Sequence, residues 1–248
     1  MVWYYIIVFF MIAGEAVVGF GSTSIGIPLL SLSLGTEASV ALLSASGLIL
    51  CFLVIATQYK KVNVRAFLTI VACIIPIMPA GFLLYVKLRA YEGVLKLIMG
   101  AVIAFVSVRA IYWRMIRARE KETSRAGMYL ALGVGAVVQG MFSTGGALIN
   151  VYTASKIKDK GEFRATMVAV WIATNVITTA YRALALHMYT RDVCVSIAYA
   201  LPLILLAYFV GNRIHKRIPN GSFMNLVYIV QLVSGLIAVF AGAGMLLR

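Results

Sequence analysis

The sequence predicts an all-α polytopic membrane protein built from two inverted repeats, each a re-entrant helical hairpin followed by three transmembrane helices. Three observations predict this fold: the mean hydropathy is +0.98, only 12% of the 248 residues are charged, and the basic residues lie in short clusters between long apolar runs. A chain with 62% hydrophobic residues has more apolar surface than a water-soluble core would hide. The formal net charge of +14 therefore indicates membrane topology, and we expect no nucleic-acid partner.

Six apolar segments are long enough to cross a bilayer, which takes roughly 20 residues of helix. We expect spans over 36–57, 66–85, 92–113, 163–186, 193–209 and 223–247. Two further segments, 2–34 and 126–154, are too long for one span and too short for two. Small polar residues interrupt each near its middle, in "GFGSTSIG" and "QGMFSTGG". Aromatic residues near span ends, among them Tyr59, Tyr91 and Trp113, indicate the membrane interfaces.

Loop charge distinguishes a kinked single crossing from a hairpin that enters and leaves on one side. With two hairpins, one face carries four basic clusters: Lys60, Lys61 and Arg65; Arg114, Arg117, Arg119, Lys121 and Arg125; Lys156, Lys158, Lys160 and Arg164; Arg213, Lys216 and Arg217. The opposite face keeps only Lys87, Arg89, Lys96, Arg182, Arg191 and Arg248. A single crossing at 126–154 would divide the clusters between the faces, so the positive-inside rule favours hairpins.

This topology sets the orientation and the repeats. We expect a plasma-membrane protein with both termini outside, and no cleaved signal peptide because no Lys or Arg precedes Lys60. Residues 1–113 form the first repeat, 114–125 a cytoplasmic linker and 126–248 the second repeat. Each repeat is a hairpin and three crossings, so the second begins from the opposite side of the membrane. The likeness of "VVGFGSTSIG" to "AVVQGMFSTGG" supports the duplication.

The two broken segments predict an anion site. Hydrocarbon offers no hydrogen-bond partner, so backbone that leaves helical geometry in a bilayer implies protein partners or a polar cavity. A half-helix begins after each break, where unpaired N–H groups and the helix dipole attract negative charge. We expect the substrate to contact Gly21, Ser22, Thr23, Ser24, Ser143, Thr144, Gly145, Gly146 and Asn150. The alternative is that these small residues only permit close helix packing.

Few other polar residues interrupt the apolar segments. Glu15 is a candidate proton-coupling group, and its alternative role is that of a protonated acid bonded to the backbone of its own hairpin. Arg182 could attract anions or extend its charge to the interface. Asn175 and Gln231 are candidate polar lining.

The stretches "GFGSTSIGIPLLSLSLG" and "GMFSTGGALINVYTASKIKDKGEFRATMVAVWIATN" resemble the TauE/SafE sulfite exporter family of membrane permeases, and the resemblance spans the chain. The residues that match the family pattern are Pro28, Leu29, Gly145, Gly146, Arg164, Ala165 and Thr166. The family's triple-glycine run is replaced by "STS" at 22–24 and "STGG" at 143–146, and Asn150 stands where the family has an apolar residue or proline. The resemblance implies transport, in the direction of export, of small sulfur-containing anions such as sulfite, thiosulfate or sulfonates.

The resulting function is a secondary transporter of a small oxyanion, working by alternating access with the substrate between the two hairpin apices. A proton or cation is the candidate coupling ion, and oligomerisation is left open. The chain has no GxxxxGK[ST] motif for a nucleotide and no His, Cys or carboxylate cluster, so we expect neither a metal nor another cofactor. An anion channel on the same cavity is one alternative. An intramembrane hydrolase is another, suggested by "LSASGL" around Ser46, but His187 and His215 fall on opposite faces in this topology.

Overall fold

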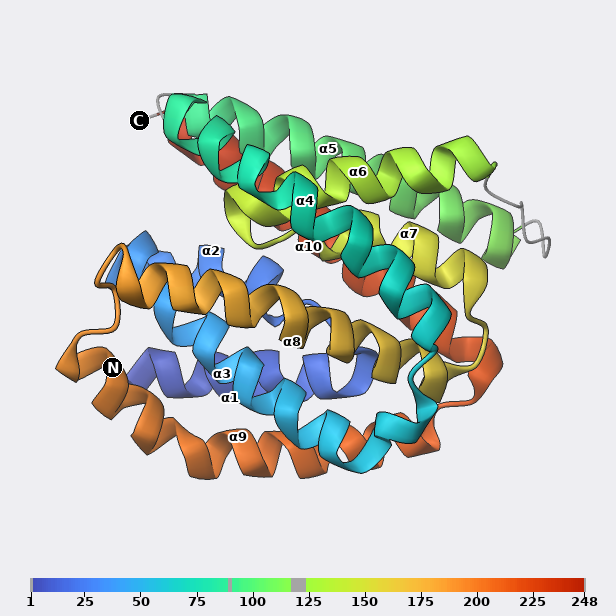
Figure 1. Ribbon diagram of the computed structural model, residues 1–248, viewed down its shortest axis with the longest axis horizontal. Coiled ribbons are helices and arrows are strands. Elements are labelled where there is room, and N and C mark those ends of the chain that lie inside the picture. Colours follow the sequence, from blue (N-terminus) through green and yellow to red (C-terminus); the bar gives the residue numbers. More distant parts are fainter. Residues whose placement is uncertain (1, 89–90, 117–123, 248) are drawn as a thin grey trace. The chain divides into compact units, whose positions relative to one another are not determined.

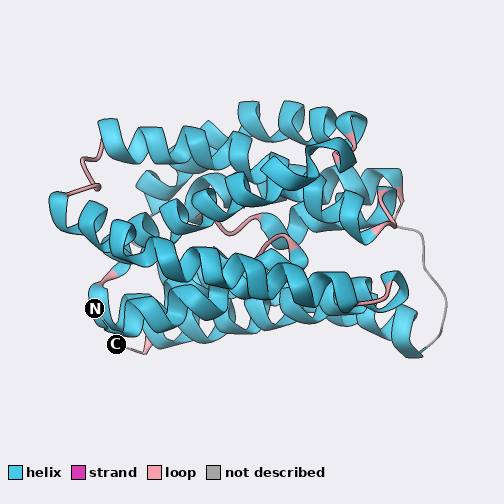
Figure 2. Ribbon diagram, turned by 90° about the horizontal axis from the view of Figure 1, so that it is seen from below, coloured by secondary structure: helices cyan, strands magenta, loops and turns pink. Residues whose placement is uncertain are grey.

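The computed structural model describes residues 2–88, 91–116 and 124–247, and the regular elements of these ranges are all helices (Figure 2). In chain order they are α1 (Val2–Val18), α2 (Ser22–Leu34), α3 (Thr36–Gln58), the 3-10 turn η1 (Tyr59–Lys61), α4 (Val64–Leu88), α5 (Glu92–Ile111), the π turn η3 (Tyr112–Ile116), α6 (Arg125–Phe142), α7 (Gly146–Lys156), α8 (Lys160–Leu184), α9 (Arg191–Arg217) and α10 (Asn220–Leu246). Residues 117–123 of the expected linker, with Arg89 and Arg248, lie outside the described ranges.

The six expected spans are present as α3, α4, α5, α8, α9 and α10, each long and apolar enough to cross a membrane. The largest difference in bounds is at α9, which continues to Arg217 although its apolar run ends near Phe209. Basic residues favour a helix C-terminus, and the helix ends only where Pro219 requires the preceding residue, Ile218, to be extended. The basic cluster Arg213–Arg217 is therefore helical.

The helices divide into two compact units, each described by itself. Unit 1 comprises residues 1–67 and 161–218, which in Figure 1 are the blue to cyan helices together with α8 and α9. Unit 2 comprises residues 68–160 and 219–248, with most of α4, α5 to α7 and α10. Each unit takes helices from both expected repeats, and the inverted relation between these repeats stays a prediction.

Glycine pairs bring α5 and α10 of unit 2 into close contact. A Cβ atom on Gly100 would lie 2.6 Å from the carbonyl oxygen of Gly235, and one on Gly242 would lie 2.6 Å from the oxygen of Gly93. Gly93 and Gly100 are seven residues apart on α5, and Gly235 and Gly242 are seven residues apart on α10. The contact therefore recurs on one face of each helix. In a bilayer, such small residues let the backbones approach and gain van der Waals contact that lipid would otherwise supply.

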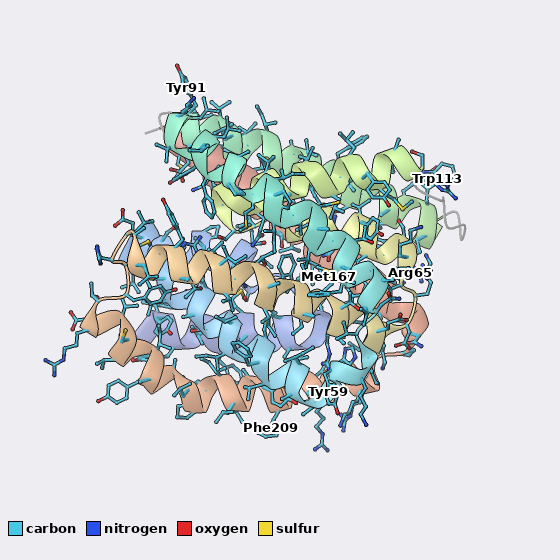
Figure 3. The ribbon with its side chains drawn as sticks, viewed as in Figure 1. Tyr59, Arg65, Tyr91, Trp113, Met167 and Phe209 are labelled. Atoms are coloured by element: carbon cyan, nitrogen blue, oxygen red, sulfur yellow. The ribbon has the colours of Figure 1, made fainter. Side chains whose placement is uncertain are left out.

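In unit 1, the helices α1 and α9 pack through small residues in the same manner. A Cβ atom on Gly211 would lie 2.5 Å from both the carbonyl oxygen of Ala13 and the Cβ of Ala16. Large apolar side chains instead cover the outer faces of the helices. Figure 3 shows Phe209 pointing away from α9, where it is 64% exposed. This apolar exterior suits contact with lipid.

Aromatic side chains mark helix ends, as the sequence predicts for membrane interfaces. Tyr91 and Trp113 lie at the two ends of α5 in unit 2 (Figure 3). In unit 1, the exposed Tyr59 follows the last residue of α3, and the basic loop comes directly after it. A 20-residue helix such as α5 is about 30 Å long, which matches the hydrocarbon thickness between two such belts.

Basic clusters gather at one end of each unit. In unit 1, the amide of Asn63, just after Lys61, donates to the hydroxyl of Thr166 at 2.9 Å, which places the loop after α3 against the first turns of α8. In unit 2, Arg114 donates to Asn225 at 2.9 Å, and the backbone N–H of Lys160 donates to the side chain of Asn220 at 3.3 Å. This grouping agrees with the loop-charge argument, while the membrane face to which it belongs stays a prediction.

The glycine contacts give a direct test of the helix packing. Gly235→Leu should lower the free energy of unfolding of the purified protein by about 1–3 kcal/mol, because the side chain would overlap the backbone of α5. Gly244→Leu is the matched control on the same helix, since nothing lies within 4 Å of a Cβ there. Thermal unfolding in detergent measures both variants. Equal melting temperatures would contradict the packing role of Gly235.

Candidate functional site

The segment 126–154 is a hairpin of two helices that fold back on each other. A Cβ atom on Gly135 of α6 would lie 3.2 Å from the backbone nitrogen of Ile149 on α7. In an unbroken helix these residues would be about 21 Å apart along the axis. A single rod through residues 126–154 is therefore wrong as a description of this segment.

The segment 2–34 reverses in the same way. A Cβ atom on Gly26 of α2 would lie 3.1 Å from the Cγ of Met11 on α1, fifteen positions earlier in the chain. Positive φ angles at Gly19 (93°) and Gly21 (110°) make the turn, which explains why glycine occupies both positions. The first half-helix ends at Val18 and the second begins at Ser22.

In the second hairpin, the side chain of Gln139 satisfies backbone at the break. Helix α6 ends at Phe142, Ser143 takes a left-handed conformation with φ 56°, and α7 begins at Gly146. The side-chain oxygen of Gln139 accepts a hydrogen bond from the N–H of Gly145 at 3.1 Å. One of the unpaired donors at the start of α7 is thus used inside the hairpin. Gln139 is the first residue of the interrupted stretch "QGMFSTGG", but sequence reasoning gave it no role.

In the first hairpin, Glu15 has the corresponding position and contact. Glu15 lies three residues before the end of α1, as Gln139 lies three residues before the end of α6. Its Oε2 accepts a hydrogen bond from the N–H of Ser22, the first residue of α2, at 3.2 Å. Glu15 therefore bonds to the backbone of its own hairpin, which is the contact anticipated in the alternative interpretation of this residue.

Three side chains from α8 and α9 satisfy the carbonyl groups at the end of α1. Arg164 Nη1 donates to the oxygen of Ala16 at 2.7 Å, the His215 ring lies 2.7 Å from the oxygen of Val17, and Trp171 Nε1 donates to the oxygen of Gly19 at 2.8 Å. The second guanidinium nitrogen of Arg164 donates to Asn212 at 2.9 Å. An arginine and a histidine also suit the negative end of the helix dipole.

The burial of Arg164 corrects its interpretation as a loop charge. Its side chain is fully buried, and its contacts are with α1 and α9. Sequence spacing contained a signal: Arg164 and Trp171 are two helical turns apart on α8, and Asn212 and His215 are one turn apart on α9. These spacings place each pair on one face, but they give no indication that both faces meet the end of α1.

Arg182 is also buried, which corrects the expectation that it extends to the interface. It is 8% exposed, and its Nη1 donates to the hydroxyl of Ser44 on α3 at 3.1 Å. Asn175, two turns earlier on α8, is partly buried, and its backbone oxygen accepts a bond from Thr178. Both residues belong to unit 1.

Several buried polar atoms have no hydrogen-bond partner in the structure. In unit 1 this holds for the hydroxyl of Ser22, a residue that is 2% exposed. In unit 2 it holds for both side-chain polar atoms of Asn150 and of Gln231, which are 0% and 1% exposed. An unpaired buried polar group costs about 1–3 kcal/mol, so such groups indicate a bound water or ligand. These three were expected as site residues from the sequence, whereas the side-chain oxygens of Gln58 and Thr179 and the Nε of Arg164, which also lack a partner in unit 1, were not.

The remaining expected site residues surround the same two breaks. In unit 1, Gly21 precedes α2, and Thr23 and Ser24 are partly buried in its first turn. In unit 2, Ser143 is buried and Thr144 partly buried in the break, with Gly145 and Gly146 buried at the start of α7. Each unit therefore holds one set of small polar residues at a half-helix start.

Comparison with protein families decides the identity of the chain. The family model for the sulfite exporter TauE/SafE matches residues 4–238. The chain belongs to the TauE/SafE family. As a TauE/SafE protein it is a multi-pass membrane transporter of a small anion and not an enzyme. Comparisons with curated proteins and with solved structures found no match.

The TauE/SafE membership overturns the hydrolase alternative, and the contacts of Ser46 agree. Its hydroxyl donates to the oxygen of Leu42 at 2.7 Å and lies 3.1 Å from the hydroxyl of Tyr4. His215 contacts the end of α1, while His187 is exposed before α9. The family-motif residues Arg164 and Thr166 instead position backbone, at the end of α1 and before α4.

The side chains that donate to the carbonyl groups at the end of α1 predict a stability effect in this TauE/SafE protein. Arg164→Met should lower the free energy of unfolding by about 1–3 kcal/mol, because the buried oxygen of Ala16 would lose its partner. Arg213→Met, an exposed position on α9, is the matched control and should change little. Melting temperatures in detergent compare the two. An Arg164→Met protein as stable as the control would contradict the capping role.

Proposed function

We propose that this TauE/SafE protein exports a small sulfur-containing oxyanion, such as sulfite, thiosulfate or a sulfonate, across the plasma membrane. Family membership supports anion transport, and the chemistry of the two breaks supports an oxyanion. Half-helix starts carry partial positive charge, and hydroxyl and amide groups donate to oxyanion oxygens. The proposed contacts are those expected from the sequence: Gly21, Ser22, Thr23, Ser24, Ser143, Thr144, Gly145, Gly146 and Asn150, with Arg182, Asn175 and Gln231 as polar lining.

The observation that carries this proposal is the unpaired amide of Asn150. Asn150 lies one turn into α7, fully buried, between Ile149 and Val151 in the chain. Its nitrogen and oxygen both lack a partner. A stable fold would gain by an apolar residue of this size here, so retaining an amide suits a ligand that accepts hydrogen bonds, as each proposed oxyanion does. A protonated oxyanion such as hydrogen sulfite offers both an acceptor oxygen and a donor O–H.

We also propose alternating access, with the substrate held between the two hairpin apices. This follows from the expected inverted repeats, whose broken segments occupy matching positions. Contacts inside the units support the repeats: Gly211 of α9 packs on α1, and Gly81 of α4 packs on Val137 and Gly140 of α6. Each contact joins the second span of one expected repeat to the first half of the other repeat's hairpin.

Substitution of Asn150 separates a binding role from a structural one. Asn150→Leu should reduce sulfite or thiosulfate flux in proteoliposomes at least tenfold, because the amide that contacts the anion is lost. The same variant should keep or raise the melting temperature, because an unpaired buried amide is removed. Counterflow of labelled anion, measured for the wild type, checks that a carrier is present.

The control for this experiment is Ser155→Ala, which removes a hydroxyl from the same helix that only bonds to the backbone oxygen of Val151. Its flux should stay near that of the wild type. Ser22→Ala and Ser39→Ala form a second pair, because Ser39 is buried but its hydroxyl bonds to Gly35. Unchanged flux in both Asn150→Leu and Ser22→Ala would contradict the proposed site.

The proposed orientation has its own test. Single cysteines at Lys158 and Lys216, in a protein without Cys51, Cys73 and Cys194, should react with an impermeant thiol reagent only from the cytoplasmic side. A cysteine at Arg191, the first residue of α9, should react only from outside. Right-side-out and inverted membrane vesicles provide the two directions. Labelling of Lys158→Cys from outside would contradict the proposed topology.

A further inference from the structure

Glu15 occupies the half-helix start that an anion would need. Its carboxylate oxygen Oε2 accepts the bond from the N–H of Ser22 at 3.2 Å, and Oε1 lies 3.9 Å from the sulfur of Cys51 on α3. The residue is 6% exposed. The first N–H of α2 is therefore engaged by a carboxyl group of the protein, which an incoming anion would have to displace.

A second group faces the same place without a partner. The hydroxyl of Ser22 is buried and makes no hydrogen bond. A Cβ atom on Gly47 of α3 would lie 3.5 Å from this hydroxyl and 3.8 Å from Glu15 Oε2. Both groups thus lie near Gly47, a residue of α3 that has no side chain. The hydroxyl is available to donate to a ligand oxygen there.

The second hairpin shows that a neutral side chain is sufficient for the structural contact. Gln139, in the corresponding position, accepts the N–H of Gly145 through an amide oxygen. A charge is thus not needed to satisfy the backbone at such a break, and burying a carboxyl group costs more than burying an amide. The carboxyl group at Glu15 provides one property that an amide lacks, which is the ability to bind and release a proton.

The ionisable groups around Glu15 come from three helices. From α3, Cys51 contributes its thiol. From α8, Arg164 donates to the oxygen of Ala16, the residue next to Glu15. From α9, the ring of His215 contacts the oxygen of Val17. On α2, the groups nearest to the carboxyl group are the N–H and hydroxyl of Ser22, which carry no charge. The Arg164 guanidinium and the His215 ring are thus directed to the end of α1.

We propose that Glu15 binds one proton for each anion that the transporter carries, and this inference rests on the proposed function. In the empty site the carboxylate holds the N–H of Ser22. When a proton from the entry side binds Glu15, the neutral acid releases the N–H of Ser22. The anion then accepts hydrogen bonds from this N–H and from the Ser22 hydroxyl. Release on the other side frees both anion and proton, and the carboxylate returns to Ser22.

This exchange fixes the charge that moves in each cycle. The site carries one negative charge when empty, on Glu15, and one when a monoanion and a proton are bound. Transport of a monoanion with its proton is therefore electroneutral. A dianion carried with the same single proton moves one net negative charge. The substrate's charge decides whether membrane potential affects the flux.

The experiment uses methanesulfonate, a monoanion that stays ionised over the working pH range, and thiosulfate as a dianion, with the full-length protein in proteoliposomes. The wild type should take up one proton per methanesulfonate, and its half-saturation concentration should fall about tenfold per unit decrease in pH while the empty site is ionised. Glu15→Gln should transport methanesulfonate without protons, with a pH-independent half-saturation concentration and a new dependence on membrane potential. Glu37→Gln, an exposed acid on α3, is the matched control and should behave as the wild type.

Proton uptake with methanesulfonate that persists in Glu15→Gln would overturn the proposal, as would wild-type transport without proton uptake. A wild type that transports neither anion would overturn the proposed function, and this inference with it. If Glu15→Gln does not fold, calorimetric binding to the wild type in buffers of different ionisation enthalpy decides the question. One proton taken up per bound anion supports the proposal, and none overturns it.

Discussion

The structure of this TauE/SafE protein depends on satisfying backbone groups where two helices break in apolar surroundings. In hydrocarbon an unpaired N–H or C=O finds no water, so every broken turn needs a partner from the protein. In unit 1, Arg164, His215 and Trp171 supply donors to the end of α1, and Glu15 supplies an acceptor to the start of α2. The break can exist only because α8 and α9 bring these donors to it. The motif arginine thus serves the fold of the hairpin.

The two hairpins share one hydrogen-bond arrangement but use different side-chain groups for it. A side chain three residues before the end of the first half-helix accepts a backbone N–H at the start of the second, and it is a carboxyl group in Glu15 and an amide in Gln139. Since the shared contact explains the shared position, the difference in charge needs a separate explanation. The hairpins are thus structurally alike, while only the first contains an ionisable group at this place.

Glycines and buried amides make different contacts in the interior of unit 2. The contacts of Gly93 and Gly100 with α10 allow α5 to approach that helix closely. Asn150 and Gln231 are buried as well, yet their amides remain unpaired. Small residues and polar residues in membrane helices therefore have distinct roles here, the first lowering the distance between backbones and the second leaving hydrogen-bonding capacity unused by the protein.

The sequence by itself determined the helical membrane fold, the six spans and the two breaks. Long apolar runs, clustered loop charges and glycine at positions 19 and 21 are local signals, because bilayer thickness and backbone conformation act on neighbouring residues. The same locality explains why Asn150 could be proposed as a site residue. Only the tertiary structure decided which groups meet the breaks: that Arg164 and Arg182 are buried, that Gln139 bonds to Gly145, and that Trp171 and His215 cap α1. These contacts join residues up to 198 positions apart, and hydrogen-bond partners at such separations are set by helix packing, which no local pattern records.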